Sequence, residues 1–292
     1  MIKSVKKFYR QRFKGQLFII KASGRIITDK KARRNLLENI QALTKDGVKI
    51  LLIYGAGEAI DEALTEAGRT PKKINGRRIT SKEDILLVKK TLAGDLGFRL
   101  LETMKDVGLN GYGLNALPPD WVGVRRRPKL DKTIRFDGEI TDVHKKEIGK
   151  FFQSVSFAAC PCLGIMEEGT SLNINADNVA IALAVSLKAS KLVLLTDVDG
   201  VKIKGKVASV LSAHELEGLI EDGTVTGGMR VKLESCIEAL RSGVKRVHIL
   251  NGFHKDVLRE EIYTSSGAGT MIVRRREKER YEAEEISKGE DR

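Results

Sequence analysis

The sequence is poor in cysteine and proline, the residues that disulfide-rich and fibrous proteins need. Of its 292 residues only three are cysteine, Cys160, Cys162 and Cys236, and only five are proline. Three cysteines cannot build a disulfide framework, and they are typical of a reducing compartment. The shortage of proline excludes collagen-like chains and proline-rich stalks.

Aromatic side chains and long apolar runs are also scarce. Aromatics make up 5% of the chain, too few for a surface that stacks nucleobases. The longest apolar runs span four to six residues, as at 49–53 and 192–195, whereas a transmembrane helix needs about 20. No apolar segment of a signal peptide follows the basic N-terminus. We therefore expect a cytoplasmic protein without a membrane partner.

Positive charge is what the sequence has in excess, and it is unevenly placed. The net charge is +13, but residues 1–14, 69–90 and 123–135 together carry +17, so the rest of the chain is net negative. Clustered bases indicate an anionic partner such as a nucleotide, an acidic small molecule or a nucleic acid. A nucleic acid is unlikely to be the partner, because charge alone supports it and no RNA- or DNA-binding motif is present.

Apolar runs alternate with amphipathic stretches along the chain. We expect strands at 17–20, 48–53, 155–163, 192–196 and 247–250, and helices at 30–46, 58–67, 81–107, 178–188, 229–242 and 255–261. This alternation predicts parallel βα units and an α/β fold with a covered sheet. Such sheets bind ligands beyond the carboxyl ends of their strands, which directs attention to Lys21, Gly55 and Thr196.

Two segments break this alternation. Residues 110–140 lack a long apolar periodicity and predict either a β-hairpin insertion or an irregular flap. Residues 273–292 carry seven bases and seven acids, which is typical of a solvated helix or a disordered tail.

Four motifs stand where these elements begin or end. They are FIIKASG at 18–24, IYGAGEAID at 53–61, the run from LNINAD to TDVDGV at 172–201, and TGGMRVKLESCIEALRSGV at 226–244. A lysine at a strand end can place a point charge on a phosphate, and a Gly-rich strand-to-helix turn offers backbone N–H groups to an anion. Each motif alone also has an ordinary explanation: a strand-end lysine, a tight turn, a helix cap or a helix start.

In this order, the motifs resemble the amino acid kinase family, and most closely its acetylglutamate kinases. The resemblance runs from about Lys14 to Met271, and its specific parts are NAD at 175–177, LTDVDGV at 195–201 and GGMRVK at 227–232. It implies a three-layer αβα sandwich with a mainly parallel central sheet. It also implies transfer of the ATP γ-phosphoryl group to the side-chain carboxylate of N-acetyl-L-glutamate in arginine biosynthesis. Mg²⁺ would be held mainly by the nucleotide phosphates, with no protein metal site.

The resemblance further implies roles for individual residues and segments. The catalytic residues would be Lys21, Asp177 and Lys232, and the phosphate-binding residues Gly24, Gly55, Ala56 and Gly57. The substrate-binding residues would be Arg78 and Asn173, and the nucleotide-binding residues Thr196, Asp197, Gly200 and Met229. The expected segments are an N-terminal helix at 1–15, an acyl-amino-acid-binding lobe at 16–185, a nucleotide-binding lobe at 186–272 and a charged tail at 273–292.

Phosphoryl transfer to a carboxylate can be promoted by two lysines and needs no strong base. The nucleophile is already ionised at neutral pH, so the chemical task is to bring two anions into line. Lysines, backbone N–H groups and Mg²⁺ offset the repulsion. A carboxylate between the lysines holds them without taking a proton.

The two ends of the chain resemble the arginine-inhibited, hexameric members of the family. Val5, Phe8, Tyr9 and Phe13 lie at helical spacing and form an apolar face, which either docks on a neighbouring subunit or packs on its own domain. Residues 247–272 resemble the segment that completes an inhibitory arginine site. The matching positions of that site are Tyr9, His248, Glu261 and Gly267. We expect a homohexamer or a homodimer, with L-arginine as a candidate inhibitor.

Two positions depart from the family pattern and keep alternatives open. Ser23 replaces the first glycine of Lys-x-Gly-Gly, and Ala56 lies within Tyr-Gly-Ala-Gly where the family has His-Gly-Gly-Gly. A methyl group at Ala56 would crowd a phosphate or hold φ negative. Tyr-Gly-Ala is similar to the kinase-like domains of N-acetylglutamate synthases, which implies a weak or inactive arginine-sensing subunit as one alternative. A kinase for carrier-linked aminoadipate is another, since an acidic carrier would suit residues 123–135, although the N-terminal helix argues against it.

The apolar face of the N-terminal helix makes the assembly state testable. At about 25 cal/mol per Å², burying this face stabilises each subunit by several kcal/mol, enough to link dimers into a closed ring. We expect a chain that starts at Lys14 to lose the hexamer in light scattering and to lose its response to arginine. A hexamer that survives the deletion with an unchanged arginine response would refute docking on a neighbour.

Overall fold

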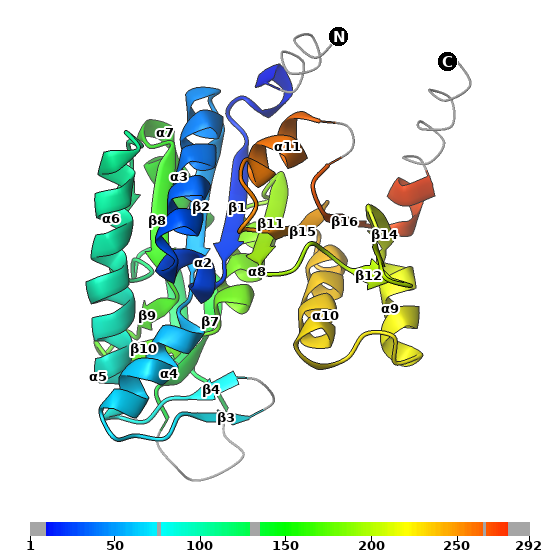
Figure 1. Cartoon of the computed structure of the whole chain (residues 1–292). Coiled ribbons are helices and arrows are strands. Elements are labelled where there is room, and N and C mark those ends of the chain that lie inside the picture. Colours follow the sequence, from blue (N-terminus) through cyan, green and yellow to red (C-terminus); the bar gives the residue numbers. More distant parts are fainter. Residues whose placement is uncertain (1–9, 75–76, 129–134, 265–266, 280–292) are drawn as a thin grey trace.

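The computed structural model describes residues 10–74, 77–128, 135–264 and 267–279 (Figure 1). An eight-stranded sheet in the order β14-β16-β15-β11-β1-β2-β8-β5 runs through the molecule. Its strands are β1 (Leu17–Ala22), β2 (Lys49–Tyr54), β5 (Tyr112–Gly113), β8 (Phe157–Pro161), β11 (Lys191–Thr196), β14 (Val210–Ser212), β15 (Val247–Asn251) and β16 (Thr270–Val273). Among the described strands of this sheet, only β15 and β16 pair antiparallel, so the predicted α/β fold with a mainly parallel sheet is confirmed.

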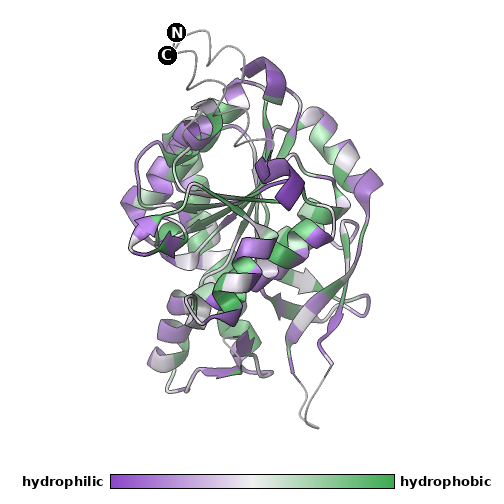
Figure 2. Ribbon diagram, turned by 90° about the vertical axis from the view of Figure 1, so that its right-hand side faces the viewer, coloured by the Kyte–Doolittle hydropathy of each residue, from purple (hydrophilic) through white to green (hydrophobic). Residues whose placement is uncertain are grey.

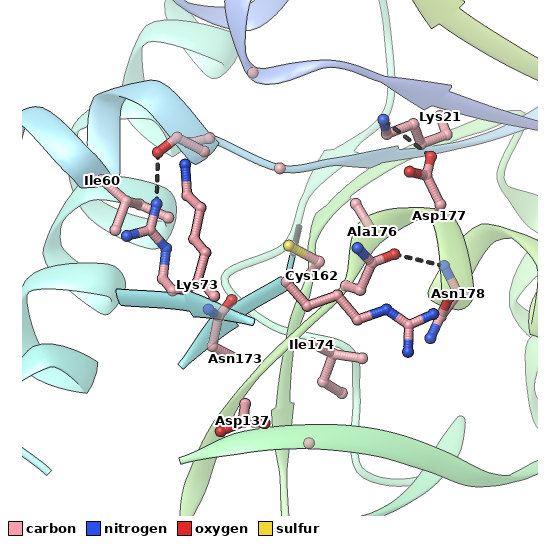
Figure 3. A pocket seen from close by; sticks show the side chains of 18 of the residues that line it. Lys21, Ile60, Lys73, Asp137, Cys162, Asn173, Ile174, Ala176, Asp177 and Asn178 are labelled. Atoms are coloured by element: carbon pink, nitrogen blue, oxygen red, sulfur yellow. Dashed lines mark hydrogen bonds and ion pairs between the residues drawn. The ribbon is translucent and has the colours of Figure 1, made fainter. Parts of the chain in front are cut away.

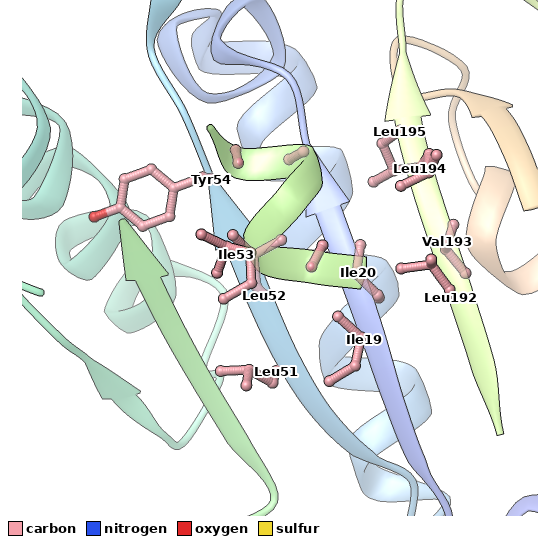
Figure 4. Packing of buried hydrophobic residues seen from close by; sticks show 14 of the residues in the cluster. Ile19, Ile20, Leu51, Leu52, Ile53, Tyr54, Leu192, Val193, Leu194 and Leu195 are labelled. Atoms are coloured by element: carbon pink, nitrogen blue, oxygen red, sulfur yellow. The ribbon is translucent and has the colours of Figure 1, made fainter. Parts of the chain in front are cut away.

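The middle of this sheet is formed by three strands that are buried on both faces. β1 lies between β2 and β11, and Phe18, Ile19 and Ile20 have no exposed surface (Figure 4). Ala22 pairs with Tyr54 on one side and Leu195 on the other. Because these parallel strands end in register, the turns that follow them gather at one edge of the sheet.

Helices cover both faces of the sheet. They are α2 (Gly24–Thr28), α3 (Lys30–Lys45), α4 (Gly57–Glu66), α5 (Asp84–Lys89), the π-helix η1 (Lys90–Leu96), α6 (Gly97–Asp106), α7 (Lys145–Ser154), α8 (Ala176–Ser186), α9 (Ala213–Glu221), α10 (Gly227–Arg241) and α11 (Val257–Tyr263). α8 crosses one face of β1 and β2, and α3 lies on the other (Figure 4). The three-layer sandwich follows from this arrangement.

The sequence of α3 explains why it forms and how it packs. Asp29 caps its first turn by accepting a hydrogen bond from the Ala32 backbone N–H at 2.7 Å, which satisfies one of the unpaired donors at a helix start. Leu36, Ile40 and Leu43 recur at helical spacing and are buried. The helices are accordingly apolar on the side that faces the sheet and polar on the outer side (Figure 2).

A second sheet flanks the carboxyl edge of the first. It has the order β6-β7-β10-β9, with β6 (Val122–Arg126), β7 (Asp137–Val143), β9 (Leu163–Ile165) and β10 (Ser171–Ile174). β6 and β7 pair antiparallel, so of the two predictions for residues 110–140 the hairpin is confirmed. Two further hairpins are β3 (Lys72–Ile74) with β4 (Arg77–Ile79), and β12 (Lys202–Ile203) with β13 (Lys206–Val207).

Some predicted boundaries are wrong for identifiable reasons. The strand expected over 155–163 ends at Pro161, because Cys162 connects the two sheets. The Cys162 backbone N–H donates to Tyr54 O at 3.1 Å, and its carbonyl accepts from the Ile174 N–H at 2.9 Å. The helical region expected over 81–107 begins at Asp84 and contains the π-helical turn η1.

The described parts of both chain ends are attached to the core. Residues 10–13 are helical, the Arg10 Nε donates to Asp46 at 2.9 Å, and the Phe13 ring meets Phe18 edge-on at 5.3 Å between centroids. Residues 275–279 are helical, and the Arg246 Nε donates to Glu277 at 2.6 Å. Val5, Phe8 and Tyr9 of the predicted N-terminal helix lie outside the described residues. Within the described chain, no helix is long and apolar enough to cross a membrane.

Candidate active site

The turns that follow β1 and β2 touch each other at the carboxyl edge of the large sheet. A Cβ added to Gly24 would lie 2.8 Å from the Ala56 Cα and 3.1 Å from the Gly57 backbone N, so only glycine permits this approach. α4 begins at Gly57, and the first backbone N–H groups of a helix have no partner within it. The two turns together therefore form a cradle that suits a phosphate group.

The two residues that depart from the family pattern fit this cradle. Ala56 has a negative φ of −148°, which does not require glycine, and the residue is only 2% exposed. The Ser23 backbone N–H donates to Leu195 O at 3.1 Å, and its buried hydroxyl has no hydrogen-bond partner among the described residues. A buried hydroxyl without a partner is costly, and a ligand oxygen would satisfy it.

An ion pair joins the end of β1 to the start of α8. The Lys21 Nζ lies 3.0 Å from Asp177 Oδ1 (Figure 3). Asp177 is placed in the first turn of α8, where Asn175 caps the helix by accepting from the Asn178 backbone N–H at 3.0 Å. Burial alone would raise the pKa of Asp177, but the charge of Lys21, with contributions from Lys232 and Arg77, holds the pKa below its usual value. Asp177 is therefore ionised at neutral pH.

The second predicted lysine belongs to the same electrostatic cluster. Lys232 comes from α10, and its Nζ donates to the Thr196 hydroxyl at 2.8 Å, at the end of β11. Burial and the charge of Lys21 lower the pKa of Lys232, whereas Asp177 raises it. Two lysines from different elements thus act on one carboxylate.

Lys21, Asp177 and the cradle border a pocket of about 260 Å³, whereas Lys232 does not line it. Of the predicted site, it brings together Lys21, Gly24, Gly55, Ala56, Gly57, Arg78, Asn173 and Asp177. The Asn173 side chain reaches it from β10 and donates to the Thr80 hydroxyl at 3.1 Å. Lysine and arginine side chains outnumber the carboxylates of its lining (Figure 3), as an anionic ligand requires.

Arg78 lies in the wall of this pocket and bonds to the start of α4. Its guanidinium lies 2.7 Å from Asp61 and donates to Gly57 O at 2.6 Å, and its side chain is 7% exposed. Lys73 reaches the same carboxylate at 2.7 Å. These contacts tie the hairpin β3–β4 to the start of α4, next to the cradle.

A second pocket of about 330 Å³ lies beside α10. Asp197, Gly200 and Met229 line it, whereas the fourth predicted nucleotide-binding residue, Thr196, contacts Lys232 instead. Gly200 has φ of +149°, and a Cβ there would lie 2.5 Å from the Thr270 hydroxyl. The glycine is therefore required by the close packing of this loop on β16.

The predicted arginine-site residues meet at the opposite edge of the sheet. His248 Nδ1 lies 2.5 Å from Glu261 Oε1, and the other oxygen of Glu261 accepts from the Ala268 backbone N–H at 2.8 Å. Gly267 has φ of +67°, and a Cβ there would lie 2.9 Å from Glu261. Three of the four predicted residues are thus brought together, and Tyr9 lies outside the described residues.

Lys191 joins this cluster, although the sequence pattern did not single it out. Its Nζ lies 3.2 Å from His248 Nε2, and the residue is only 6% exposed. Burial lowers the pKa of Lys191 to about 8. The sequence signal was a lysine at the first position of an otherwise apolar buried strand.

Arg77 and Arg127 line the 260 Å³ pocket and were also missed. The only signal for them was the basic composition of residues 69–90 and 123–135, which does not distinguish a pocket arginine from a solvated one.

A parallel α/β sheet whose carboxyl edge gathers two lysines, an ionised carboxylate and a backbone cradle is a structure built to handle phosphate. The sequence comparison agrees: the amino acid kinase family matches residues 16–251. The chain belongs to this family.

Acetylglutamate kinases are among the relatives that match nearly the whole chain. That of Halothermothrix orenii is 36% identical over 275 residues, 92% of this chain and 94% of its own. That of Methanocaldococcus jannaschii is 33% identical over 277 residues, 90% of this chain and 92% of its own.

Solved structures show the same fold. N-acetylglutamate synthase from Neisseria gonorrhoeae, complexed with coenzyme A and N-acetyl-glutamate, has a TM-score of 0.84 at 26% identity over 94% of this chain. The match covers 63% of the synthase, so this chain spans less than two thirds of that protein. The same synthase complexed with coenzyme A and L-arginine has a TM-score of 0.82 at 26% identity, over 92% of this chain and 64% of the synthase.

The geometry of the cradle predicts that the chain binds nucleotide with Ser23 and Ala56 in place. The φ of Ala56 needs no glycine, and the Ser23 hydroxyl is free to meet a phosphate oxygen. We expect calorimetry to detect MgATP binding by the unmodified chain. If neither binding nor turnover appears, while the double variant Ser23→Gly, Ala56→Gly gains both, the inactive alternative is correct.

The low pKa of Lys191 predicts a pH-dependent stability. The pKa is about 8 when folded, against an ordinary value of 10.5, so between these values the unfolded chain binds more protons and stability rises with pH. Relative to Lys191→Met, the wild-type free energy of unfolding should rise by on the order of 3 kcal/mol from pH 8 to pH 10.5. Urea denaturation of both proteins across this range measures it. A difference that stays constant with pH would contradict the assignment.

Proposed function

We propose that this chain transfers the γ-phosphoryl group of ATP to the side-chain carboxylate of N-acetyl-L-glutamate. The observation that carries the proposal is the convergence of Lys21 and Lys232 on Asp177 beside a backbone cradle. Acetylglutamate kinases that match nearly the whole chain support the choice of acceptor.

The lysines and the cradle serve to hold two anions close together. The acceptor carboxylate is its own nucleophile, so no side chain has to remove a proton. Lys21 and Lys232 offset the charge of the phosphoryl group during transfer, and N–H groups at the start of α4 bind its oxygens. Asp177 stays ionised, holds the Lys21 ammonium group at the pocket and attracts the charge of Lys232. We assign Arg78 and Asn173 to the wall that shapes the acceptor site.

The nucleotide is proposed to bind on the side of α10. Asp197, Gly200 and Met229 line the 330 Å³ pocket there, so residues 186–272 form the nucleotide-binding lobe and residues 16–185 the acceptor lobe. Within the described chain no group of three or more His, Cys, Asp or Glu side chains could hold a metal ion. We propose that Mg²⁺ enters on the nucleotide phosphates, where it would neutralise part of their charge.

We also propose that L-arginine regulates the chain at the His248–Glu261–Gly267 cluster. A buried carboxylate is a bidentate partner for a guanidinium, and Glu261 is such a group. The structural neighbour complexed with L-arginine supports the choice of ligand. A homo-oligomer in the cytoplasm, with the N-terminal helix docked between subunits, completes this proposal.

One assay separates the acceptors. ADP release is measured with N-acetyl-L-glutamate, N-acetyl-L-aspartate and N-acetyl-L-aminoadipate, with and without L-arginine. We expect turnover to be fastest with N-acetyl-L-glutamate. Faster turnover with the aminoadipate derivative would favour the carrier-linked alternative, and no turnover with any acceptor would favour the arginine-sensing alternative.

Loss of either lysine should remove most of the catalysis. We expect Lys21→Ala or Lys232→Ala to lower kcat by about 100-fold or more, the usual result of removing one group that stabilises transition-state charge. Steady-state kinetics measures this, and the exposed Lys150→Ala, whose partner is Glu147 on the same helix, is the control. A fully active Lys232→Ala enzyme would disprove the assignment.

A further inference from the structure

A continuous network of polar side chains leads from Lys232 to Arg25 along the carboxyl edge of the large sheet. The Lys232 Nζ donates to the Thr196 hydroxyl at 2.8 Å, and the same hydroxyl donates to Asp197 Oδ1 at 3.1 Å. The other carboxylate oxygen of Asp197 accepts from Arg25 Nη1 at 2.6 Å. The network therefore connects α10, the end of β11 and α2.

The chemistry of the side chains sets the direction of each hydrogen bond. A lysine ammonium group has only donors, whereas a hydroxyl has one hydrogen and two lone pairs. The Thr196 hydroxyl must turn a lone pair toward Lys232, and the carboxylate of Asp197 favours this rotation because it accepts the hydroxyl hydrogen. Partial burial would raise the pKa of Asp197, but hydrogen bonds from the backbone, Thr196 and Arg25 hold the pKa below its usual value. Asp197 is therefore an ionised acceptor at neutral pH.

Arg25 connects this network to the proposed phosphate cradle. It directly follows Gly24 in α2, and its Nε lies 3.5 Å from Glu58 in the first turn of α4. Arg25 is not among the described residues that line the 260 Å³ pocket or the 330 Å³ pocket. Its side chain is 54% exposed, so the ion pair with Asp197 contributes little to the stability of the fold. The role of Arg25 can therefore be tested without unfolding the protein.

We propose that Arg25 is a positioning residue for Lys232. Arg25 fixes the carboxylate of Asp197, the carboxylate orients the Thr196 hydroxyl, and the hydroxyl holds the ammonium group of Lys232 in place. A lysine ends a flexible four-carbon chain, so neighbouring groups must fix its position, and a displaced catalytic group slows a reaction. The inference rests on the proposed function, in which Lys232 stabilises the charge of the transferred phosphoryl group.

The kinetic test is a double-mutant cycle between the two ends of the network. The proteins are the wild type, Arg25→Met, Thr196→Val, the double variant and Arg25→Lys, and each is assayed for kcat and for the KM of ATP and of N-acetyl-L-glutamate. Arg241→Met is the matched control, because Arg241 ends the same helix that carries Lys232 and donates to Glu217 at 2.6 Å in another exposed ion pair.

The expected result is a loss of kcat that is not additive. Arg25→Met and Thr196→Val should each lower kcat by about 10-fold, the scale of a misplaced catalytic group. The double variant should fall no more than about 3-fold below the slower single variant, whereas independent effects would multiply to about 100-fold. Arg25→Met should change both KM values by less than about 3-fold, because Lys232 acts in the transition state. Arg25→Lys should recover part of kcat, and Arg241→Met should behave as wild type.

A second measurement reports on Lys232 without any turnover. ¹⁵N NMR relaxation of the lysine ammonium groups measures how far each group is immobilised, and Lys232→Ala assigns the signal. Mildly acidic pH slows exchange of the ammonium protons with water, and the low pKa of Asp197 keeps its carboxylate ionised there. We expect the Lys232 ammonium group to become more mobile in Arg25→Met and in Thr196→Val, and to keep its wild-type mobility in Arg241→Met. The signals of the other lysines check that the fold is intact.

Each contrary outcome has its own meaning. A Lys232 signal that becomes mobile in Thr196→Val but stays unchanged in Arg25→Met refutes the positioning role of Arg25. Multiplicative losses of kcat, or an Arg25→Met variant that raises only the KM for ATP, also refute it, because Arg25 would then act independently of the network. A wild type that releases no ADP with any acceptor overturns the proposed function, and the NMR comparison still decides whether Arg25 positions Lys232.

Discussion

The ion pair between Lys21 and Asp177 is the interaction on which the site depends. It fastens the end of the central strand to the first turn of the helix that crosses the sheet. Both groups are largely removed from water, and a charge in that position needs a partner in good geometry. Removing either would take away the direct partner of the other, so the same contact that organises the proposed phosphate site also fixes α8 on β1.

Lys232 and Thr196 extend this arrangement across the molecule. The bond between them joins α10 to the end of β11, while the Gly24–Ala56 contact joins the turns after β1 and β2. Groups from three neighbouring strands and two helices therefore meet at one edge. No single element could supply charges, backbone donors and an acceptor wall at this spacing, and a sheet of parallel strands ending in register supplies them together.

The sequence predicts the sheet well, because its buried strands give strong local signals. Buried strands appear in the sequence as short apolar runs. Because the residues just after such runs are neighbours in a parallel sheet, the sequence predicts that Lys21 and Gly55 lie at the same edge. Assignment of Asp177 and Lys232 needed the family resemblance, since a helix start is otherwise unremarkable. Two of the missed strands are short or lie at the sheet edge: β14 has three residues and β16 pairs antiparallel at the far side of β15. The nine-residue helix α9 was missed although Ser212 and Glu215 form a capping box at its start.

The features that the sequence does not predict are contacts between residues far apart in the chain, because such contacts leave no periodic pattern. Whether an arginine in a basic segment is paired depends on carboxylates far away in the chain, as Asp61 is for Arg78. Nothing in the sequence separates Arg77, for which the described residues supply no ion pair, from the arginine beside it. The same holds for Lys191, whose burial follows from the packing of β11 beneath Phe13 and beside His248.

Strand β11 begins at Lys191 and ends at Thr196, so it has one end in the His248–Glu261 cluster and the other beside Lys232. At about 3.3 Å per residue the two ends are about 17 Å apart. The strand is hydrogen-bonded on both sides, to β1 and to β15, and such a strand can neither shorten nor stretch appreciably. The His248–Glu261 cluster and the Lys232 ammonium group therefore lie at opposite ends of one strand, and the two ladders hold the distance between them nearly fixed.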